Sequence, residues 1–212
     1  MRDNCRTGGA RQHWSRAVSG RFISLEGVDG SGKSTQASML ADALRDRGHD
    51  VVAVREPGGT PLGEAIRDVV LGPDAMSPWA EALLFAAARA QLVADVIRPA
   101  LEGGQWVVAD RFLDSSLAYQ GTARGLGIER VAQVNAPAID DCMPDLTIII
   151  DIDPASAADR RAGRGSVDRI EDEGEALQEA VAAGYREVAR LFPERIALVS
   201  GAGSLDEVHT HV

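Results

Sequence analysis

Short apolar runs alternate with helix-length segments along most of the 212-residue chain. After the mainly apolar residues 22–25, for example, Met39, Leu40 and Leu44 recur at helical spacing before Gly48. This alternation predicts an α/β fold, with a parallel five-stranded sheet and helices on both faces. The predicted strands lie within residues 21–27, 49–58, 105–112, 145–153 and 195–202.

The ends of these strands are where binding residues are expected, because ligands of such sheets bind beyond the carboxyl ends of the strands. The residues at these positions are polar or glycine, which fits a binding site better than a core. They are Asp29, Arg55, Glu56, Asp110, Arg111, Asp153 and Gly201.

The segment GVDGSGKS, from Gly27 to Ser34, fits the phosphate-binding pattern G-x-x-x-x-G-K-[ST]. It stands between a predicted strand and a predicted helix, so backbone N–H groups and the helix start can converge on an anion. We therefore predict a fold of the P-loop NTPase type; the alternative is a chance glycine-serine turn. The predicted ATP-binding residues are Gly27, Val28, Asp29, Gly30, Ser31, Gly32, Lys33, Ser34 and Thr35.

Lys33 is the only lysine in the chain, and every other basic residue is arginine. An ammonium is a compact point charge that can reach two phosphates in a narrow loop, whereas a guanidinium is a broad planar fork. We therefore predict that Lys33 is catalytic and spans the outer phosphates, and that the Ser34 hydroxyl binds Mg²⁺.

Asp110 ends the apolar run of residues 107–109, where a carboxylate has little structural reason to be. We predict that it holds Mg²⁺ opposite Ser34; the alternative is a cap at the start of the next helix. Arg111 would lie over the same cleft, or else on the surface.

A buried helix is predicted from about Trp79 to Leu101, because residues 81–97 are apolar nearly all round. Arg89 interrupts this run, and Phe85 stands one turn before it on the same face. The pair could offer an aromatic plane and a hydrogen-bonding fork to a flat polar ligand. By spacing alone, the alternative of a core phenylalanine beside a snorkelling arginine is favoured over this ligand role.

The segment DRRAGRGSVDRIEDE, residues 159–173, is rich in charge and glycine and poor in apolar surface. It predicts a small mobile lid over about residues 156–172, whose arginines close on the transferring phosphoryl group. Arg160 and Arg164 are the predicted catalytic arginines of this segment, and Arg111, after the third predicted strand, is the third predicted catalytic arginine of the chain. The alternative is a solvated charged helix with ion pairs four residues apart.

The composition predicts one domain, residues 21–212, because 45% hydrophobic residues in a chain of this length suffice for one sizeable core. A net charge of −10 argues against nucleic-acid or anionic-membrane binding. No apolar run approaches a membrane span. Two cysteines are too few for a disulfide framework and favour a reducing, cytoplasmic location.

Residues 1–20 have no hydrophobic periodicity and carry four arginines against one acid. We expect a disordered N-terminal extension. It has no apolar stretch typical of a secretory signal, and a transit peptide is kept as a minor alternative.

The chain also lacks certain catalytic patterns. Its four histidines lie outside the clusters described above, and no N-K-x-D guanine-reading motif occurs. A phosphate monoester has a second pKa near about 6, so it arrives ionised and needs no general base. Phosphoryl transfer to a monophosphate therefore fits these residues.

With these motifs in order, residues 21–212 resemble the thymidylate kinase family, which converts dTMP to dTDP using MgATP. Besides the phosphate loop, the likeness rests on REPGGTPLGEAIR, LLFAAARAQ, DRFLDSSLAYQG, PDLTIIIDIDP and DRIE. The phosphate loop alone is shared by many ATPases, but these segments together are specific. The resemblance also implies a homodimer.

The resemblance implies a role for each matching residue in dTMP binding. Asp29 would contact the sugar 3′-hydroxyl, and Arg67 and Arg111 would hold the acceptor phosphate. The remaining assignments are Phe85 stacking on thymine, Arg89 bonding its O4, Ser116 at the base edge near N3, Tyr119 beside C2′, and Glu56 supporting the acceptor side.

The position of the catalytic arginine divides the family, and this phosphate loop contains none, which is similar to bacterial members with lid-borne arginines. Phe112 departs from the tyrosine or histidine that often follows the acceptor arginine, and Arg161 has no settled counterpart. Two alternatives stay open: another small nucleoside or nucleotide kinase, and a nucleotide-dependent switch or partition ATPase without an acceptor.

Overall fold

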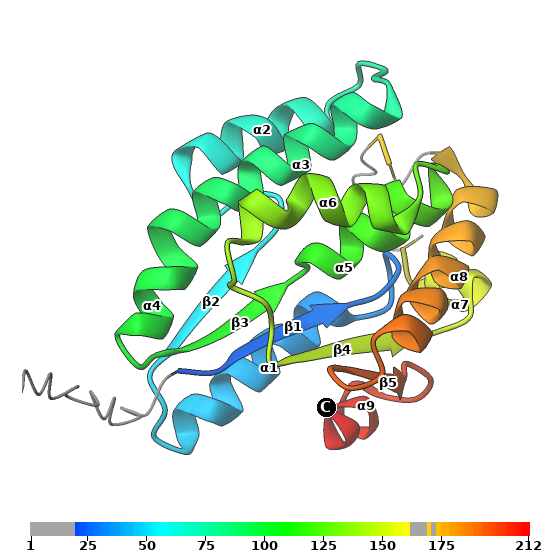
Figure 1. Cartoon of the computed structure of the whole chain (residues 1–212). Helices are drawn as coiled ribbons and strands as arrows, with labels where there is room; N and C mark the ends of the chain where they lie inside the picture. Colours follow the sequence, from blue (N-terminus) through cyan, green and yellow to red (C-terminus); the bar gives the residue numbers. More distant parts are fainter. Residues whose placement is uncertain (1–19, 162–168, 171–172) are drawn as a thin grey trace, which may run out of the picture.

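The computed structural model describes residues 20–161, 169–170 and 173–212. The expected N-terminal extension and most of the predicted lid lie outside these residues. The described residues form one α/β unit (Figure 1). No helix in this part of the chain is both long and apolar enough to cross a bilayer.

The predicted parallel sheet is confirmed in all five strands. β1 (Phe22–Glu26), β2 (Val51–Arg55), β3 (Trp106–Asp110), β4 (Leu146–Asp151) and β5 (Ile196–Ser200) pair in the order β2-β3-β1-β4-β5. Asp110 stands opposite Leu25 of β1 and Arg55 of β2. The carboxyl ends of these three strands therefore lie at one edge of the sheet.

Helices cover both faces of the sheet (Figure 1). Their bounds are α1 Lys33–Asp46, α2 Pro61–Leu71, α3 Pro78–Leu92, α4 Arg98–Glu102, α5 Leu113–Ser116, α6 Ile128–Ile139, α7 Pro154–Arg161, α8 Glu175–Leu191 and α9 Leu205–His211, with π-helical turns η1 Val93–Ile97 and η2 Leu117–Ala123. Alternate strand residues face the two layers, as the two-residue period of a strand requires. Ile23 and Leu25 pack with α1, whereas Phe22 and Val107 pack in the larger core beneath α3, α5, α6 and α8.

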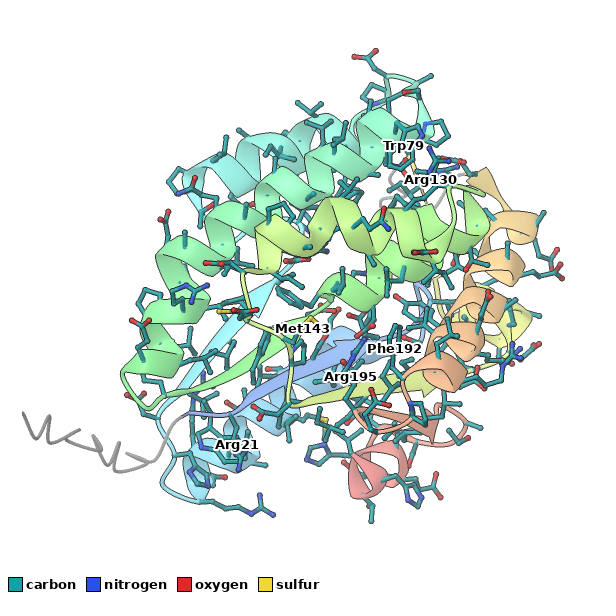
Figure 2. All side chains as sticks on the ribbon, in the orientation of Figure 1. Arg21, Trp79, Arg130, Met143, Phe192 and Arg195 are labelled. Atoms are coloured by element: carbon teal, nitrogen blue, oxygen red, sulfur yellow. The ribbon has the colours of Figure 1, made fainter. Side chains whose placement is uncertain are left out.

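The long helix predicted over residues 79–101 is present from Pro78 to Glu102, with a wider π-helical turn at Val93–Ile97. Pro99 has no N–H to donate to the turn before it, which gives a physical reason for the irregularity there. The start of α3 contacts α6 through side chains: the Arg130 guanidinium lies 4.8 Å from the ring centroid of Trp79 (Figure 2).

Glycine is required at the start of the phosphate loop. Gly27 has a φ of 143°, and a Cβ there would lie 2.8 Å from the carbonyl oxygen of Ile150. Gly32 then has a left-handed φ of 92° and leads directly into α1. These two positions place the first turn of α1 beyond the end of β1.

Candidate active site

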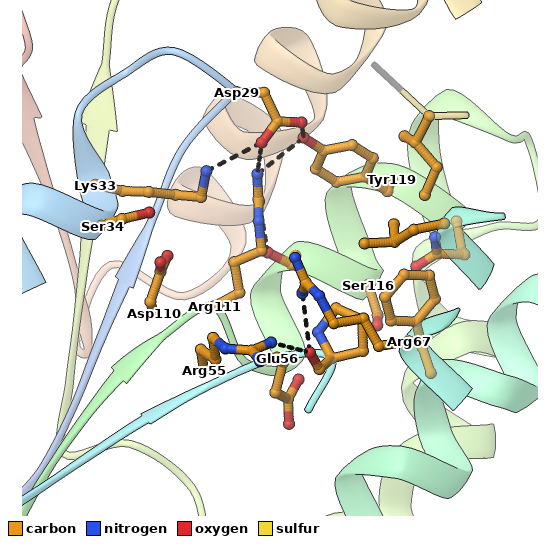
Figure 3. A pocket seen from close by; sticks show the side chains of 16 residues that line it. Asp29, Lys33, Ser34, Arg55, Glu56, Arg67, Asp110, Arg111, Ser116 and Tyr119 are labelled. Atoms are coloured by element: carbon orange, nitrogen blue, oxygen red, sulfur yellow. Dashed lines mark hydrogen bonds and ion pairs between the residues drawn. The ribbon is translucent and has the colours of Figure 1, made fainter. Parts of the chain in front are cut away.

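A pocket of about 380 Å³ opens at the carboxyl ends of β1, β2 and β3 (Figure 3). This is the edge at which the sequence predicts binding. Residues from the phosphate loop, the ends of β2 and β3, α2, α3 and the α5–η2 segment line it. The predicted site residues among them are Asp29, Lys33, Ser34, Glu56, Arg67, Phe85, Asp110, Arg111, Ser116 and Tyr119.

The phosphate loop forms one wall of the pocket. No described side chain caps the first N–H groups of α1, and the Ser31 hydroxyl is buried without a hydrogen-bond partner among the described residues. Uncapped N–H groups and a positive helix end favour an anion. The Lys33 ammonium lies in the same wall, so the wall has the chemistry of a phosphate cradle.

Asp29 joins the phosphate-loop wall to the opposite side of the pocket. Its carboxylate accepts hydrogen bonds from Lys33 Nζ at 3.1 Å, Arg111 Nη2 at 2.5 Å and the Tyr119 hydroxyl at 2.9 Å. Burial alone would raise the pKa of Asp29, but the charges of Arg111 and Lys33 outweigh it and hold the pKa well below its usual value. Asp29 is therefore ionised at every pH at which the protein is expected to work.

Arg111 follows the end of β3 in a left-handed backbone conformation, with a φ of 74°. Its Nη1 donates to the Ser115 and Tyr185 hydroxyls at 3.0 and 2.8 Å, while Nη2 donates to Asp29 and, at 3.2 Å, to the Tyr119 hydroxyl. Burial lowers the pKa of Arg111, but these partners raise it well above its ordinary value. The result is a fixed positive charge in the pocket wall.

Asp110 and Ser34 form the candidate metal site. The Asp110 Oδ1 atom is buried and has no hydrogen-bond partner among the described residues. Figure 3 shows the Asp110 carboxylate and the Ser34 hydroxyl directed towards the same space beside Lys33. Helix α5 begins after Phe112, so Asp110 is not its N-cap, and that alternative is wrong. One carboxylate and one hydroxyl fit a Mg²⁺ ion that takes its other ligands from water and phosphate oxygens.

Phe85, Ser116 and Tyr119 also line the pocket. Figure 3 shows Ser116 away from the phosphate loop, and Tyr119 with its hydroxyl on Asp29. Arg67 of α2 also lines the pocket, and its Nη1 donates to the Pro57 carbonyl oxygen at 3.0 Å. An aromatic ring, a hydroxyl and an arginine are thus available to one ligand in the pocket.

Arg89 lies behind this wall, with only 1% of its surface exposed, and is not among the described residues that line the pocket. Its N–H groups donate to Glu56, Ser116, Asn135 and the Phe112 carbonyl oxygen. The head group is buried and ion-paired, so the alternative of a snorkelling arginine is wrong. In this arrangement Arg89 holds two lining residues, Glu56 and Ser116; its contact with thymine O4 stays a prediction.

The predicted lid is described only at its two ends. Arg160, in α7, donates from Nη2 to the Gly201 carbonyl oxygen at 3.1 Å, and Arg164 lies outside the described residues. Near the other end, Ile170 lines the pocket, and Arg169 is bound by Glu81 at 2.6 Å and by the Val70 carbonyl oxygen. The catalytic roles of Arg160 and Arg164 therefore stay predictions.

The sequence analysis missed several residues at the site. Gln120 and Ser115 line the pocket next to predicted residues, and their adjacency to Tyr119 and Ser116 was a usable signal. Glu26, a buried carboxylate at the end of β1, offered the same signal as Asp110. Tyr185 offered none, because it reaches the site from the apolar face of α8.

Comparison with known proteins matches residues 25–212 to the thymidylate kinase family model. The chain is 51% identical over 193 residues to the thymidylate kinase of Rhizorhabdus wittichii, covering 89% of this chain and 93% of that protein. It is 48% identical over 198 residues to the one from Pelotomaculum thermopropionicum, covering 92% of each.

Among solved structures, the thymidylate kinase of Ehrlichia chaffeensis superimposes with a TM-score of 0.72 at 32% identity, covering 91% of this chain and 96% of that one. Membership of one family therefore accounts for the fold, for the phosphate loop and for the two cationic side chains that bond Asp29. The chain belongs to the thymidylate kinase family, ATP-using enzymes that phosphorylate dTMP to dTDP.

Proposed function

We propose that dTMP binds in the described pocket with its phosphate on Arg111, and that ATP binds with its phosphates on the loop around Lys33. One observation carries this proposal: Lys33 Nζ and Arg111 Nη2 bond the same Asp29 oxygen, at 3.1 and 2.5 Å. A cation suited to the donor phosphates and a cation suited to the acceptor phosphate thus converge on one point. In-line transfer requires the reacting groups to meet in this way.

The residues of the chain act by position and charge. Lys33 and the N–H groups of the loop offset the charge of the ATP phosphates, and Arg111 orients the acceptor oxygen. The acceptor monoester has a second pKa near about 6, so no residue is needed to remove its proton at neutral pH. Asp29 keeps both cations in place and bonds the sugar 3′-hydroxyl of the acceptor.

Ser34 and Asp110 are the proposed protein ligands of Mg²⁺. The orphan Oδ1 of Asp110 supports this assignment, since a buried carboxylate oxygen without a partner is costly unless a cation or water meets it. When bound, Mg²⁺ would offset the negative charge of the ATP phosphates.

The thymidine portion is proposed to lie against Phe85, with Ser116 near N3 and Arg89 serving O4. Tyr119 would lie beside C2′, Arg67 would share the acceptor phosphate, and Glu56 would support Arg89, with which it forms a 2.5 Å ion pair. Five of these side chains line the same pocket, which supports the proposal. Arg160 and Arg164 are proposed to meet the transferring phosphoryl group.

We also propose a homodimer. Three large apolar side chains on the neighbouring helices α2 and α3 are about half exposed: Leu62 at 48%, Val69 at 55% and Leu83 at 54%. An apolar face of this kind on a globular protein favours association with a second copy. Substrates of cytoplasmic metabolism and the free thiol of Cys142 support a cytoplasmic location.

A substrate panel tests the proposed function. The rate of ADP formation is measured with dTMP, dUMP, dCMP, dGMP and thymidine, with and without Mg²⁺. We expect ADP formation to depend on dTMP and Mg²⁺, with slower reaction for the other monophosphates and none for thymidine, which has no acceptor phosphate. ADP release at the same rate without any acceptor would contradict the proposal and favour a switch ATPase.

A further inference from the structure

Glu26 lies at the end of β1, directly before the phosphate loop, and is completely buried. Its carboxylate accepts four hydrogen bonds: from Ser24 Oγ at 2.9 Å, Phe112 N at 2.7 Å, Ser115 Oγ at 2.5 Å and the Tyr185 hydroxyl at 3.1 Å. Three of these four donors adjoin or contact Arg111. Glu26 itself is not among the described residues that line the pocket.

The first link from Glu26 to Arg111 passes through the backbone. With a φ of 74°, Arg111 is in a left-handed conformation that a non-glycine residue adopts only where its surroundings enforce it. The Arg111 N–H bonds the Leu25 carbonyl oxygen at 3.0 Å, and the next N–H, that of Phe112, bonds Glu26. The carboxylate thus holds the peptide that follows the strained residue.

The second link passes through two hydroxyl groups. An ionised carboxylate can only accept hydrogen bonds, and the Ser115 and Tyr185 hydroxyls both donate to Glu26, although they also lie 2.9 Å from each other. Their lone pairs are then available to Arg111 Nη1, which donates to both, at 3.0 and 2.8 Å. With a neutral amide in place of the carboxylate, one or both hydroxyls could turn, and Arg111 would lose this acceptor pair.

We propose that Glu26 is the positioning residue of Arg111. It fixes the Arg111 backbone through Phe112 and the guanidinium through Ser115 and Tyr185. The acceptor phosphate therefore binds to a guanidinium that is already oriented. This inference rests on the proposed binding of the dTMP phosphate by Arg111. It explains why a carboxylate is buried where it lines no pocket, at a place in the core where an apolar residue would otherwise serve.

The effect of positioning can be separated from that of general stability by comparing two ligands. Thymidine and dTMP share the base and sugar, but only dTMP carries the phosphate that Arg111 is proposed to bind. A disturbed pocket would weaken both ligands, whereas a misplaced Arg111 would weaken dTMP alone.

The experiment is calorimetric titration of dTMP and of thymidine into the wild type and into Glu26→Gln, at pH 8. Burial raises the pKa of Glu26 to about 7, so the carboxylate is mainly ionised at that pH. We expect Glu26→Gln to weaken dTMP binding at least tenfold and to change thymidine binding less than twofold. Ser24→Ala is the matched control, because it removes a donor to the same carboxylate that does not contact Arg111.

Two further variants keep the test decisive if Glu26→Gln does not fold. Tyr185→Phe and Ser115→Ala each remove one hydroxyl between Glu26 and Arg111, and each should weaken dTMP selectively by about threefold or more. In an Arg111→Ala background, neither these changes nor Glu26→Gln should weaken dTMP further.

Equal losses of thymidine and dTMP affinity, unchanged dTMP affinity, or the same effect from Ser24→Ala would overturn the positioning role. If Arg111→Ala itself left dTMP affinity unchanged, the proposed phosphate contact would be wrong. The positioning role and the function on which it rests can therefore fail separately.

Discussion

At the scale of single residues, the site is arranged around one shared carboxylate. Asp29 bonds Lys33, Arg111 and Tyr119, residues that come from the start of α1, the end of β3 and η2. Like charges that converge on a site repel each other unless a counter-charge lies between them. Asp29 supplies that charge, and a phosphoryl group bound at the same point would add to it.

Replacing Lys33 should abolish phosphoryl transfer without unfolding the protein. Lys33 makes one described ion pair and contributes little to the apolar core, so Lys33→Ala should lower kcat by on the order of 10²-fold or more. Lys33→Arg should also fail, because the planar fork is broader than the ammonium. Steady-state kinetics and thermal unfolding measure the two effects; near wild-type activity in folded Lys33→Ala would refute the role of the loop.

Tyr119 is expected to exclude ribonucleotides. Its ring lines the pocket, so Tyr119→Ala should open space beside C2′ and raise the kcat/KM ratio of ribo- to deoxyribo-TMP about tenfold, a barrier difference of about 1.4 kcal/mol. Tyr119→Phe is the matched control, since it keeps the ring and loses only the hydroxyl that bonds Asp29. If both variants kept the wild-type ratio, Tyr119 would not select the sugar.

The presence of residues in the pocket was predictable from the sequence where a local pattern fixed it. The G-x-x-x-x-G-K-S pattern gave Lys33 and Ser34, and the carboxylate after an apolar strand gave Asp110. The partners of Arg111 were not predictable in this way, because Tyr185 meets Glu26 across 159 positions in the sequence. Such a contact depends on how α8 packs on η2 and α5, which no short pattern encodes.

At the scale of elements, the central strands β1, β3 and β4 were predictable because a parallel strand buried on both faces is an apolar run of limited length. The π-helical turns were not predictable. Hydrophobic period alone does not distinguish a π-helical turn from the α-helix around it, and η1 keeps the apolar pattern of its neighbours. The short α5 was also hidden, since its four residues are too few for a helical period.

Helix α7 carries the arginine that tests the lid prediction. In the described structure Arg160 bonds the Gly201 carbonyl oxygen. An arginine that meets the phosphoryl group mainly in the transition state should affect kcat more than KM. Arg160→Ala and Arg164→Ala should each lower kcat roughly a hundredfold or more with little change in the KM for dTMP.

Arg161→Ala is the internal comparison for this series and should matter less. Rates are measured at saturating ATP and varied dTMP for each variant and for the triple variant. If all of them kept kcat within about threefold of the wild type, a barrier change under roughly 1 kcal/mol, the lid arginines would not be catalytic.

At the scale of the whole molecule, the exposed apolar side chains of α2 and α3 predict self-association. Leu83→Glu would place a charge at the proposed interface, where it would be desolvated without a partner, and should shift a dimer to monomer. Leu205→Glu is the control, because Leu205 is equally exposed, at 53%, but begins α9, where an acidic residue is tolerated. Sedimentation velocity measures the mass; a monomeric wild type would contradict the homodimer.

The pH dependence of folding stability offers a second test on the whole molecule. Burial, and then the Asp114 charge, raise the pKa of Glu26 from 4.5 to about 7, although hydrogen bonding and Arg111 oppose them. Between pH 4.5 and about pH 7, the Glu26 carboxyl group keeps its proton in the folded state but has released it in the unfolded state. The contribution of Glu26 to the free energy of unfolding is therefore fully present below about pH 4.5 and is lost as pH rises through about 7.

Glu26→Gln removes this titration, and every other titratable residue is present in both proteins. The difference in unfolding free energy between wild type and variant should therefore change by about 2 kcal/mol between pH 5 and pH 8, to the disadvantage of the wild type at pH 8. The contribution of Asp29 to stability has the opposite dependence on pH, because its pKa is lowered on folding and its contribution is lost only at pH values below the usual pKa of an aspartate. Both proteins contain Asp29, so its contribution cancels in the difference. Urea unfolding at pH 5, 6, 7 and 8 measures the difference, and a constant value across this series would mean that Glu26 does not titrate with a raised pKa.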